Sequence, residues 1–335
     1  MSMLVPDFWA EGRAQSRAGQ RQITVRRFGW SMAGQDDAQR MADERAQAAL
    51  ARVLAGERLA RRDRKVPYNG ADGLPIREQV VSRHGDEVIT RNSYGALCLN
   101  TPRVLIADVD NVKVRLRGTW ALWWGLVALT IGVGVALLPV HGMGWAALIA
   151  SALVLATAVA ALIHAIRQGR QRRRELSGDA QSPARQRVQA FADAHPDWGL
   201  RVYRTPAGLR LIVTHRVFDS GEPVVAEFFA AVQADPLYVA MCRHQHCFRA
   251  RLTGKPWRMG IEDHLKPRPG VWPVAPESVP ARDAWLAAYD ARARSFAACR
   301  FEKVLGPTAQ PLDVAVVVDL HDSLSHALKP ELTLA

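Results

Sequence analysis

The chain has 335 residues, of which 49% are hydrophobic and 23% are charged, and 44 Lys and Arg against 32 Asp and Glu give a net charge of +12. This mixture excludes a disordered chain, a collagen-like repeat and a disulfide scaffold. The four cysteines are few and scattered, which indicates reduced thiols in a cytoplasmic setting. The first 13 residues carry charges and no apolar stretch, so we expect no cleaved signal peptide.

The N-terminal part predicts a strand followed by helices. Residues Gln22–Trp30 alternate as in a strand, and Asp36 or Asp37 can cap a helix rich in Ala and Arg that runs to about Leu59. Residues Pro75–His84 are interpreted as a short helix.

A short apolar strand, Arg103–Asp110, then ends in two acids, Asp108 and Asp110. Strand alternation places both carboxylates on one face, about 7 Å apart, where their repulsion is costly unless a divalent cation or basic groups compensate it. Such a pair can hold Mg²⁺ or Mn²⁺ for phosphoryl transfer. The alternative is that Asp108 caps a turn while Asp110 faces water near Lys113 and Arg115.

The next segment, residues 118–166, contains no Asp, Glu, Lys or Arg in 49 consecutive positions. A bilayer core needs roughly 20 apolar residues, so this length predicts about two spans. The helix-breaking cluster Pro139–Gly142 divides them into Trp120–Leu138 and Met143–Ile166. The segment therefore predicts a transmembrane helical hairpin.

The flanks of this hairpin set its expected orientation. The predicted anchoring residues are the basic and Trp side chains at its borders: Arg115, Arg117, Trp120, Trp123, Trp124, Trp145, Arg167, Arg170, Arg172, Arg173 and Arg174. Positive residues stay inside, so we expect a two-span, multi-pass protein of the cell membrane with both termini cytoplasmic. The expected partners are the lipid bilayer and anionic lipid headgroups. Small residues every four positions favour packing within the hairpin or a homo-oligomer seam.

After the hairpin, the sequence predicts further helices and strands. Pro183–Ala194 reads as an amphipathic helix, and the turn Pro206–Gly208 joins two strands, Arg201–Thr205 and Leu209–Thr214. The later expected elements are helices at Gly221–Ala234 and Ala281–Lys303, a Pro-rich irregular stretch at Pro267–Pro280 and a buried strand at Val314–Asp319.

These elements predict one α+β cytoplasmic domain, with a mixed or antiparallel sheet and flanking helices, split by an inserted transmembrane hairpin. Its two parts are residues 1–117 and 182–335, the hairpin is 118–166, and 167–181 is a basic juxtamembrane linker. Residues 1–117 and residues 167–335 each carry a net charge of +6, and a long insertion at a surface connection costs little free energy.

Basic residues near Cys242–Cys247 form another candidate site. Four Cys and His side chains within six residues cannot wrap one tetrahedral zinc ion, so we do not expect a zinc site there. In a strand, Arg249 and Arg251 point the same way, and with Lys255, Arg258 and Arg210 they can meet phosphate or acidic lipid headgroups. His215 is a further candidate for phosphate binding. A solvated basic face is the alternative.

The order of a strand carrying two acids, a helix, and two strands joined by a Gly turn resembles the catalytic core of the archaeo-eukaryotic primase and primase-polymerase superfamily. The resemblance covers about Arg103–Asp110 and Leu200–His215. It implies metal binding by Asp108 and Asp110 and phosphate contact by the strand after Gly208. Where that superfamily has Gly-x-His, this chain has Gly208-Leu209-Arg210, with the histidine displaced to His215.

Two functions follow from these observations. The first is a non-catalytic, membrane-associated binding or scaffold protein with a basic cytoplasmic domain and a protein partner. The alternative is a metal-dependent domain, tethered to the membrane, that binds a nucleotide or nucleic acid and resembles the primase-polymerases in its phosphoryl-transfer chemistry. The positive charge fits both, because nucleic acid and anionic lipid each attract Lys and Arg.

Overall fold

The computed structural model describes residues 3–18, 21–63, 70–110, 163, 166, 182–268, 270 and 272–335. The chain divides into two compact units, one made of Met1–Val109 with Ala184–Ala335 and the other of Asp110–Pro183. The first unit contains the hydrophobic core of the described residues.

The strands, in chain order, are β1 (Phe8–Ala18), β2 (Arg21–Ser31), β3 (Gln79–His84), β4 (Glu87–Arg91), β5 (Leu97–Thr101), β6 (Ile106–Asp110), β7 (Leu200–Thr205), β8 (Gly208–Val213), β9 (Phe248–Arg251), β10 (Phe296–Ala297), β11 (Arg300–Leu305) and β12 (Thr333–Leu334). The helices are α1 (Gln35–Leu54), α4 (Pro183–Ala194), α5 (Pro223–Val232), α6 (Pro236–Gln245), α7 (Val279–Ala293) and α8 (Leu312–Ser325), with short 3-10 helices η1 (Pro256–Arg258) and η2 (Pro276–Ser278).

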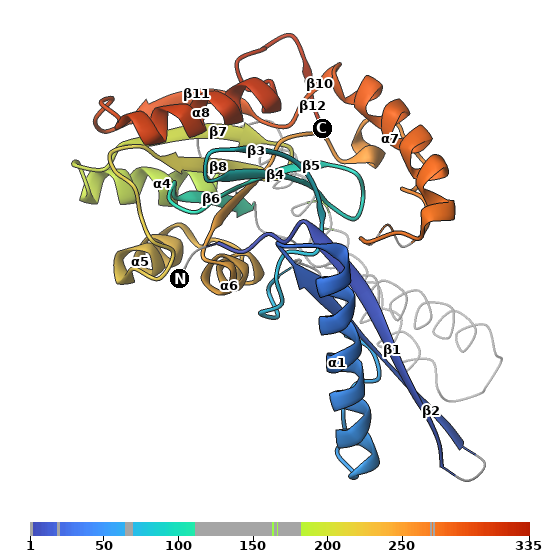
Figure 1. Ribbon diagram of the computed structural model, residues 1–335. Helices are drawn as coiled ribbons and strands as arrows, with labels where there is room; N and C mark the ends of the chain where they lie inside the picture. Colours follow the sequence, from blue (N-terminus) through green and yellow to red (C-terminus); the bar gives the residue numbers. More distant parts are fainter. Residues whose placement is uncertain are drawn as a thin grey trace, which may run out of the picture. The chain divides into compact units, whose positions relative to one another are not determined.

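Strands β1 and β2 form a long antiparallel ribbon, and α1 packs along it (Figure 1). The buried side of α1 is a stripe of alanines: Ala38, Ala42, Ala46 and Ala49. A Cβ atom added at Gly12 or Gly29 would lie 2.2 Å from backbone atoms of Ala42, so these two glycines let the helix lie directly on the ribbon.

A four-stranded sheet in the order β11-β7-β8-β6 lies at the centre of the core. Every residue of β8 is buried, which means that both faces of this strand are covered. Helix α8 covers one face, where the ring of His321 lies 4.8 Å from that of Tyr203 on β7 (Figure 1). Phe191 of α4 and Phe228 of α5 pack edge to face in the same core, with ring centroids 5.0 Å apart.

A second sheet has the order β3-β4-β5-β9, with every neighbouring pair antiparallel. Ile89 of β4, Leu99 of β5 and Phe248 of β9 are fully or almost fully buried and belong to the same large core cluster as the first sheet. The sheet therefore packs into that core.

Several elements differ from those that the sequence predicted. Val314–Asp319 is part of helix α8, because Val314, Val317, Val318 and His321 are buried at helical spacing. Residues Gln79–His84 of the expected helix Pro75–His84 form strand β3, which pairs with β4. Two helices are shorter than expected: α1 ends at Leu54, shortly before Gly56 with φ +93°, and α7 ends at Ala293, before strands β10 and β11.

The expected transmembrane hairpin is corrected. Among the described residues, none of the helices combines the length and the hydropathy that a bilayer crossing requires. The longest, α1, has 20 residues but carries charged side chains along its exposed side, and the others are 15 residues or shorter and bury one side in the core or against a sheet. This finding overturns a fold split by such a hairpin and the assignment to a multi-pass membrane protein with two spans.

The residues on which that prediction rested, 118–166, lie outside the described part of the chain except for Ile163 and Ile166. The predicted anchors also lie outside it: Arg115, Arg117, Trp120, Trp123, Trp124, Trp145, Arg167, Arg170, Arg172, Arg173 and Arg174.

All four cysteines are free thiols, and all four are buried: Cys98, Cys242, Cys247 and Cys299. Burial raises the pKa of the Cys247 thiol to about 12. Burial also raises the pKa of Cys98 and Cys242, and thiols with a raised pKa are poorly ionised near neutral pH and therefore react slowly.

Candidate functional site

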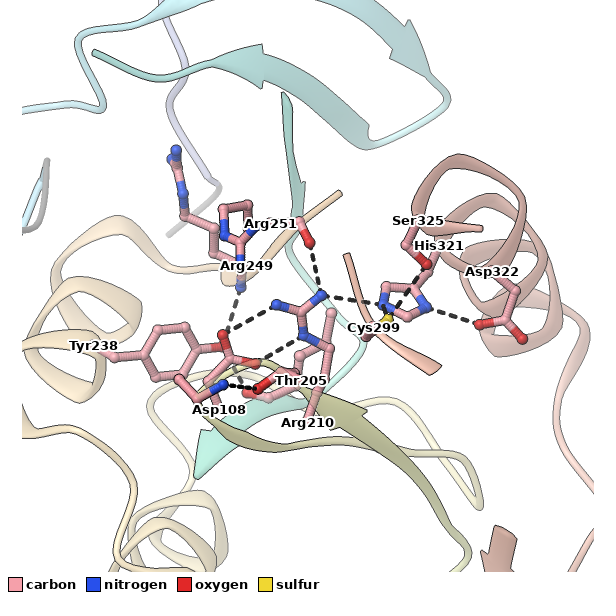
Figure 2. Close-up of polar contacts among 12 residues, drawn as sticks. Asp108, Thr205, Arg210, Tyr238, Arg249, Arg251, Cys299, His321, Asp322 and Ser325 are labelled. Carbon is pink, nitrogen blue, oxygen red and sulfur yellow. Dashed lines mark hydrogen bonds and ion pairs between the residues drawn. The ribbon is translucent and has the colours of Figure 1, made fainter. Parts of the chain in front are cut away.

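Arg210 lies at the centre of a buried polar network (Figure 2). Its Nε and Nη2 atoms donate to the two carboxylate oxygens of Asp108 on β6, at 2.7 and 3.1 Å, and its Nη1 atom donates to the backbone carbonyl of Arg251 at 2.8 Å. Arg210 lies on β8, directly opposite Tyr203 on β7, so the two side chains point to the same face of the central sheet. Burial disfavours the charge of Arg210, but the Asp108 carboxylate outweighs it and holds the pKa of the guanidinium above its ordinary value.

The same face carries a cysteine, a histidine and an aspartate in hydrogen-bonding order (Figure 2). The Sγ atom of Cys299 lies 3.7 Å from Nε2 of His321, and Nδ1 of His321 lies 2.8 Å from Oδ1 of Asp322. Burial alone would raise the pKa of Cys299, but His321 and Arg210 lower it below its ordinary value. This is the order of a nucleophile, a base and an orienting carboxylate.

Access distinguishes this arrangement from a catalytic triad. Cys299 and His321 are 0% exposed and Ser325, which accepts a hydrogen bond from Cys299, is 1% exposed. Asp322 also accepts a hydrogen bond from Nη2 of Arg201 on β7 at 2.7 Å. The network therefore ties α8 to the central sheet, and no substrate can reach the thiol without displacing these elements.

A second buried network joins the strands of the other sheet. Arg249 on β9 donates from Nη1 to Oδ1 of Asn100 at 2.9 Å and from Nη2 to the carboxylate of Glu78. The hydroxyl of Thr90 donates to the same Glu78 carboxylate at 2.7 Å. Burial works against the charge of Arg249, but nearby Cys98 and Glu78 raise the pKa of the guanidinium well above its ordinary value.

The structure brings together only part of the predicted phosphate site. Arg210 and Arg249 are committed to internal carboxylates, and Arg251 donates to the backbone carbonyls of Thr253 and Ala335. His215 packs elsewhere, between the rings of Trp198 and Phe218, and burial lowers its pKa. The Lys255 ammonium lies 5.5 Å from the Trp257 ring.

The described residues do not fit the Mg²⁺ or Mn²⁺ that the primase-polymerase resemblance implies. Both oxygens of Asp108 accept hydrogen bonds from Arg210, and that positive charge would repel a cation. Asp110 is the last residue of β6, the strand that carries Asp108. In the part of the chain that the structure describes, no three His, Cys, Asp or Glu side chains form a group able to hold a metal ion. The resemblance itself stays a prediction from the sequence.

A basic surface that the sequence did not predict lies on the ribbon. Since α1 covers the inner side at Gly12 and Gly29, the side chains of alternate residues point outward. Near the base of the ribbon this side carries the aromatic residues Trp9, Phe28 and Trp30. We define the outer ribbon face by the polar residues on the same side, together with Arg62, which is bridged to Arg26: Glu11, Arg13, Gln15, Arg17, Gln22, Thr24, Arg26 and Arg62. The side-chain amide of Gln15 lies within hydrogen-bond distance of Thr24 and of Gln22, both at 3.2 Å, which agrees with a shared face.

Three arginines form a row across this face. Arg13 lies directly opposite Arg26 in the register of β1 and β2, and Arg26 pairs in turn with Arg62 through an isolated parallel bridge. Side chains at such positions have Cβ atoms about 5 Å apart, and like charges directly opposite each other are destabilising. In the described residues, the one ion pair that this row makes is between Arg26 and Glu11, at 3.5 Å. The row therefore has an excess of positive charge, carried by the exposed Arg13 and Arg62 and by the partly buried Arg26.

A signal for this face is present in the sequence. Small residues Gly12 and Ala14 alternate with Glu11, Arg13 and Gln15, as expected of a strand with a closely packed inner side. The lack of β-branched residues in Phe8–Ala18 concealed the strand.

Comparison of the chain with protein-family models, curated proteins and solved structures finds no match.

Proposed function

We propose that this protein binds double-stranded nucleic acid, without catalysis, through ionic contacts between the outer ribbon face and the phosphate backbone. The observation that carries the proposal is the row of Arg13, Arg26 and Arg62. Repulsion within a row of like charges destabilises the free protein. Bound phosphates would neutralise these charges and accept hydrogen bonds from the guanidinium groups. Arginine suits this contact because its planar guanidinium binds phosphate through two hydrogen bonds.

The shape of the ribbon also supports this ligand. A two-stranded antiparallel ribbon fits the major groove of duplex DNA, which is about 12 Å wide. Helix α1 packs on the opposite side and stiffens the ribbon before binding, so that less ordering entropy is lost on association. Gln15, Gln22 and Thr24 lie beside the arginines and offer further hydrogen-bonding groups.

The interior gives a second argument for binding without catalysis. The Cys299 and His321 pair is 0% exposed, so the arrangement most similar to a reactive centre has no contact with solvent. The arginines of this interior network, Arg201 and Arg210, are hydrogen-bonded to the carboxylates of Asp322 and Asp108. The exposed arginines of the ribbon are therefore the best candidates for an external ligand.

The test is fluorescence anisotropy of a labelled duplex of about 20 base pairs, titrated with the full-length protein over a range of salt concentrations. We expect the double variant Arg13→Gln/Arg26→Gln to bind about tenfold or more weakly at moderate salt. Its plot of log affinity against log salt should be flatter by about two, because each lost phosphate contact removes about one unit of slope.

A matched control removes two other arginines from the same unit. Arg40 and Arg52 lie on α1, with side chains 69% and 60% exposed, and pair with Asp37 and Glu57. The variant Arg40→Gln/Arg52→Gln has the same net charge as the ribbon variant. If both variants lose equal affinity, or neither loses any, the outer ribbon face is not the contact surface and the proposal is wrong.

A further inference from the structure

We infer that Trp257, on the short helix η1, is a stacking site for an unpaired nucleobase of single-stranded nucleic acid. This inference rests on the proposed function in one respect, since both take the ligand to be nucleic acid, but it concerns a different surface. Trp257 is 57% exposed, whereas its neighbour Pro256 is buried and Met259 is 1% exposed. An indole ring thus stands in solvent on a turn that is anchored by the buried Pro256 and Met259.

The turn that carries Trp257 is held on both sides by hydrogen bonds. Before it, the Tyr289 hydroxyl donates to the carbonyl of Gly254 at 2.6 Å and bonds to the Thr253 hydroxyl at 2.7 Å. After it, Nε of Arg292 donates to the carbonyl of Met259 at 2.9 Å. A ring presented on such a fixed turn loses little conformational freedom when a ligand stacks on it.

The surroundings of the ring favour a nucleotide. The Tyr94 ring packs edge to face against it, with centroids 5.5 Å apart, and supports its orientation. The Lys255 ammonium lies 5.5 Å from the ring centroid, within the range of a cation–π contact. An aromatic face next to a lysine matches the two parts of a nucleotide, because the base stacks and one of the three ammonium hydrogens can meet the phosphate.

Other exposed apolar residues lack this combination. Leu312 on α8 is 78% exposed but has no aromatic face on which a base can stack. Duplex nucleic acid keeps its bases paired and stacked, so Trp257 would distinguish single strands from the duplex that the ribbon is proposed to bind.

The test is fluorescence anisotropy of a labelled oligothymidylate of about 20 nucleotides with the full-length protein. We expect Trp257→Ala to weaken binding by about tenfold, since one stacked base commonly contributes that much, and Trp257→Phe to keep most of the affinity. An abasic strand of equal length and charge should bind the unmodified protein as weakly as oligothymidylate binds Trp257→Ala.

The control Leu312→Ala removes another exposed apolar side chain and should leave binding unchanged. The inference is overturned if Trp257→Ala binds oligothymidylate normally, if Leu312→Ala weakens binding equally, or if the abasic strand binds as well as the strand with bases. Failure of the ribbon proposal has a different signature, because the Arg13→Gln/Arg26→Gln variant would then bind the duplex normally whatever Trp257 does.

Discussion

The arginines of the two sheets and those of the ribbon have opposite electrostatic surroundings: the former are buried beside carboxylates, and the latter lie near one another at the surface. Arg210 and Arg249 are at most 7% exposed, and each has a carboxylate from a neighbouring part of the fold within hydrogen-bond distance. Arg13 and Arg26 lie opposite each other at the surface, where they repel. The net charge of +12 therefore does not by itself indicate an anionic ligand. Only arginines that are not paired with a carboxylate in the interior can contribute to binding one.

The largest effect that tests this comparison is expected from Asp108→Ala. It leaves the Arg210 guanidinium buried beside the empty place of its carboxylate, and breaking such a pair typically costs about 3 kcal/mol or more. Urea denaturation followed by circular dichroism should show this loss in the free energy of unfolding. Duplex binding by the ribbon should persist under conditions where the variant is folded.

The double variant Asp108→Leu/Arg210→Met is the control for that experiment. It removes both charges and keeps apolar volume, so it should recover at least half of the lost stability. If the double variant is as unstable as Asp108→Ala, the loss of stability does not come from the unpaired Arg210 guanidinium. Arg210 would then not depend on the Asp108 carboxylate to be stable in the interior.

An effect of intermediate size is expected from the pH dependence of Asp322→Asn. Burial favours the neutral acid, but the hydrogen bond from His321 and the charges of His321 and Arg201 outweigh it and hold the pKa of Asp322 below its ordinary value of 3.8. The ionised carboxylate therefore stabilises the fold above that pH, and this stabilisation is lost as the pH falls through the lower, folded-state pKa.

Consequently, Asp322→Asn should be less stable than the natural sequence by about 2 kcal/mol at neutral pH. The difference should shrink below about pH 4. Urea titrations at neutral pH and at about pH 3 measure it. A difference that stays constant over this range would mean that the charge of Asp322 does not contribute to stability.

The smallest effect on stability is expected at the ribbon, with the opposite sign. Arg13→Glu places a carboxylate directly opposite Arg26 and should raise the free energy of unfolding by about 0.5 kcal/mol. The same change should weaken duplex binding, because it reverses one charge of the proposed contact. Glu11→Gln, which removes the partner of Arg26, should lower stability slightly and strengthen binding. If Arg13→Glu destabilises the protein, the arginine row is not repulsive.

The sequence predicted best those elements whose signals are local. The turn at Pro206–Gly208 and the strands on both sides of it are confirmed by the pairing of Thr205 with Gly208. Helix α4 has the predicted bounds, Pro183–Ala194, and strand β2 contains the predicted Gln22–Trp30. In each case, alternation or a turn within a few residues decides the structure.

Predictions failed where contacts between distant segments decide the structure. A run of valines such as Val314–Val318 suits a strand by propensity, yet its burial at helical spacing against the central sheet makes it part of α8. The role of Asp108 was missed for a similar reason. Its partner Arg210 lies 102 positions away, so local spacing offered Asp110 as the companion instead.

The burial of all four thiols has a practical consequence for labelling chemistry. A maleimide dye reacts with an accessible thiolate, and none of the natural cysteines offers one on the surface of the native fold. A single cysteine introduced at the exposed position of Gln15 would therefore take the dye selectively, without a cysteine-free background. The emission of that dye could then report on the ribbon as its surroundings change.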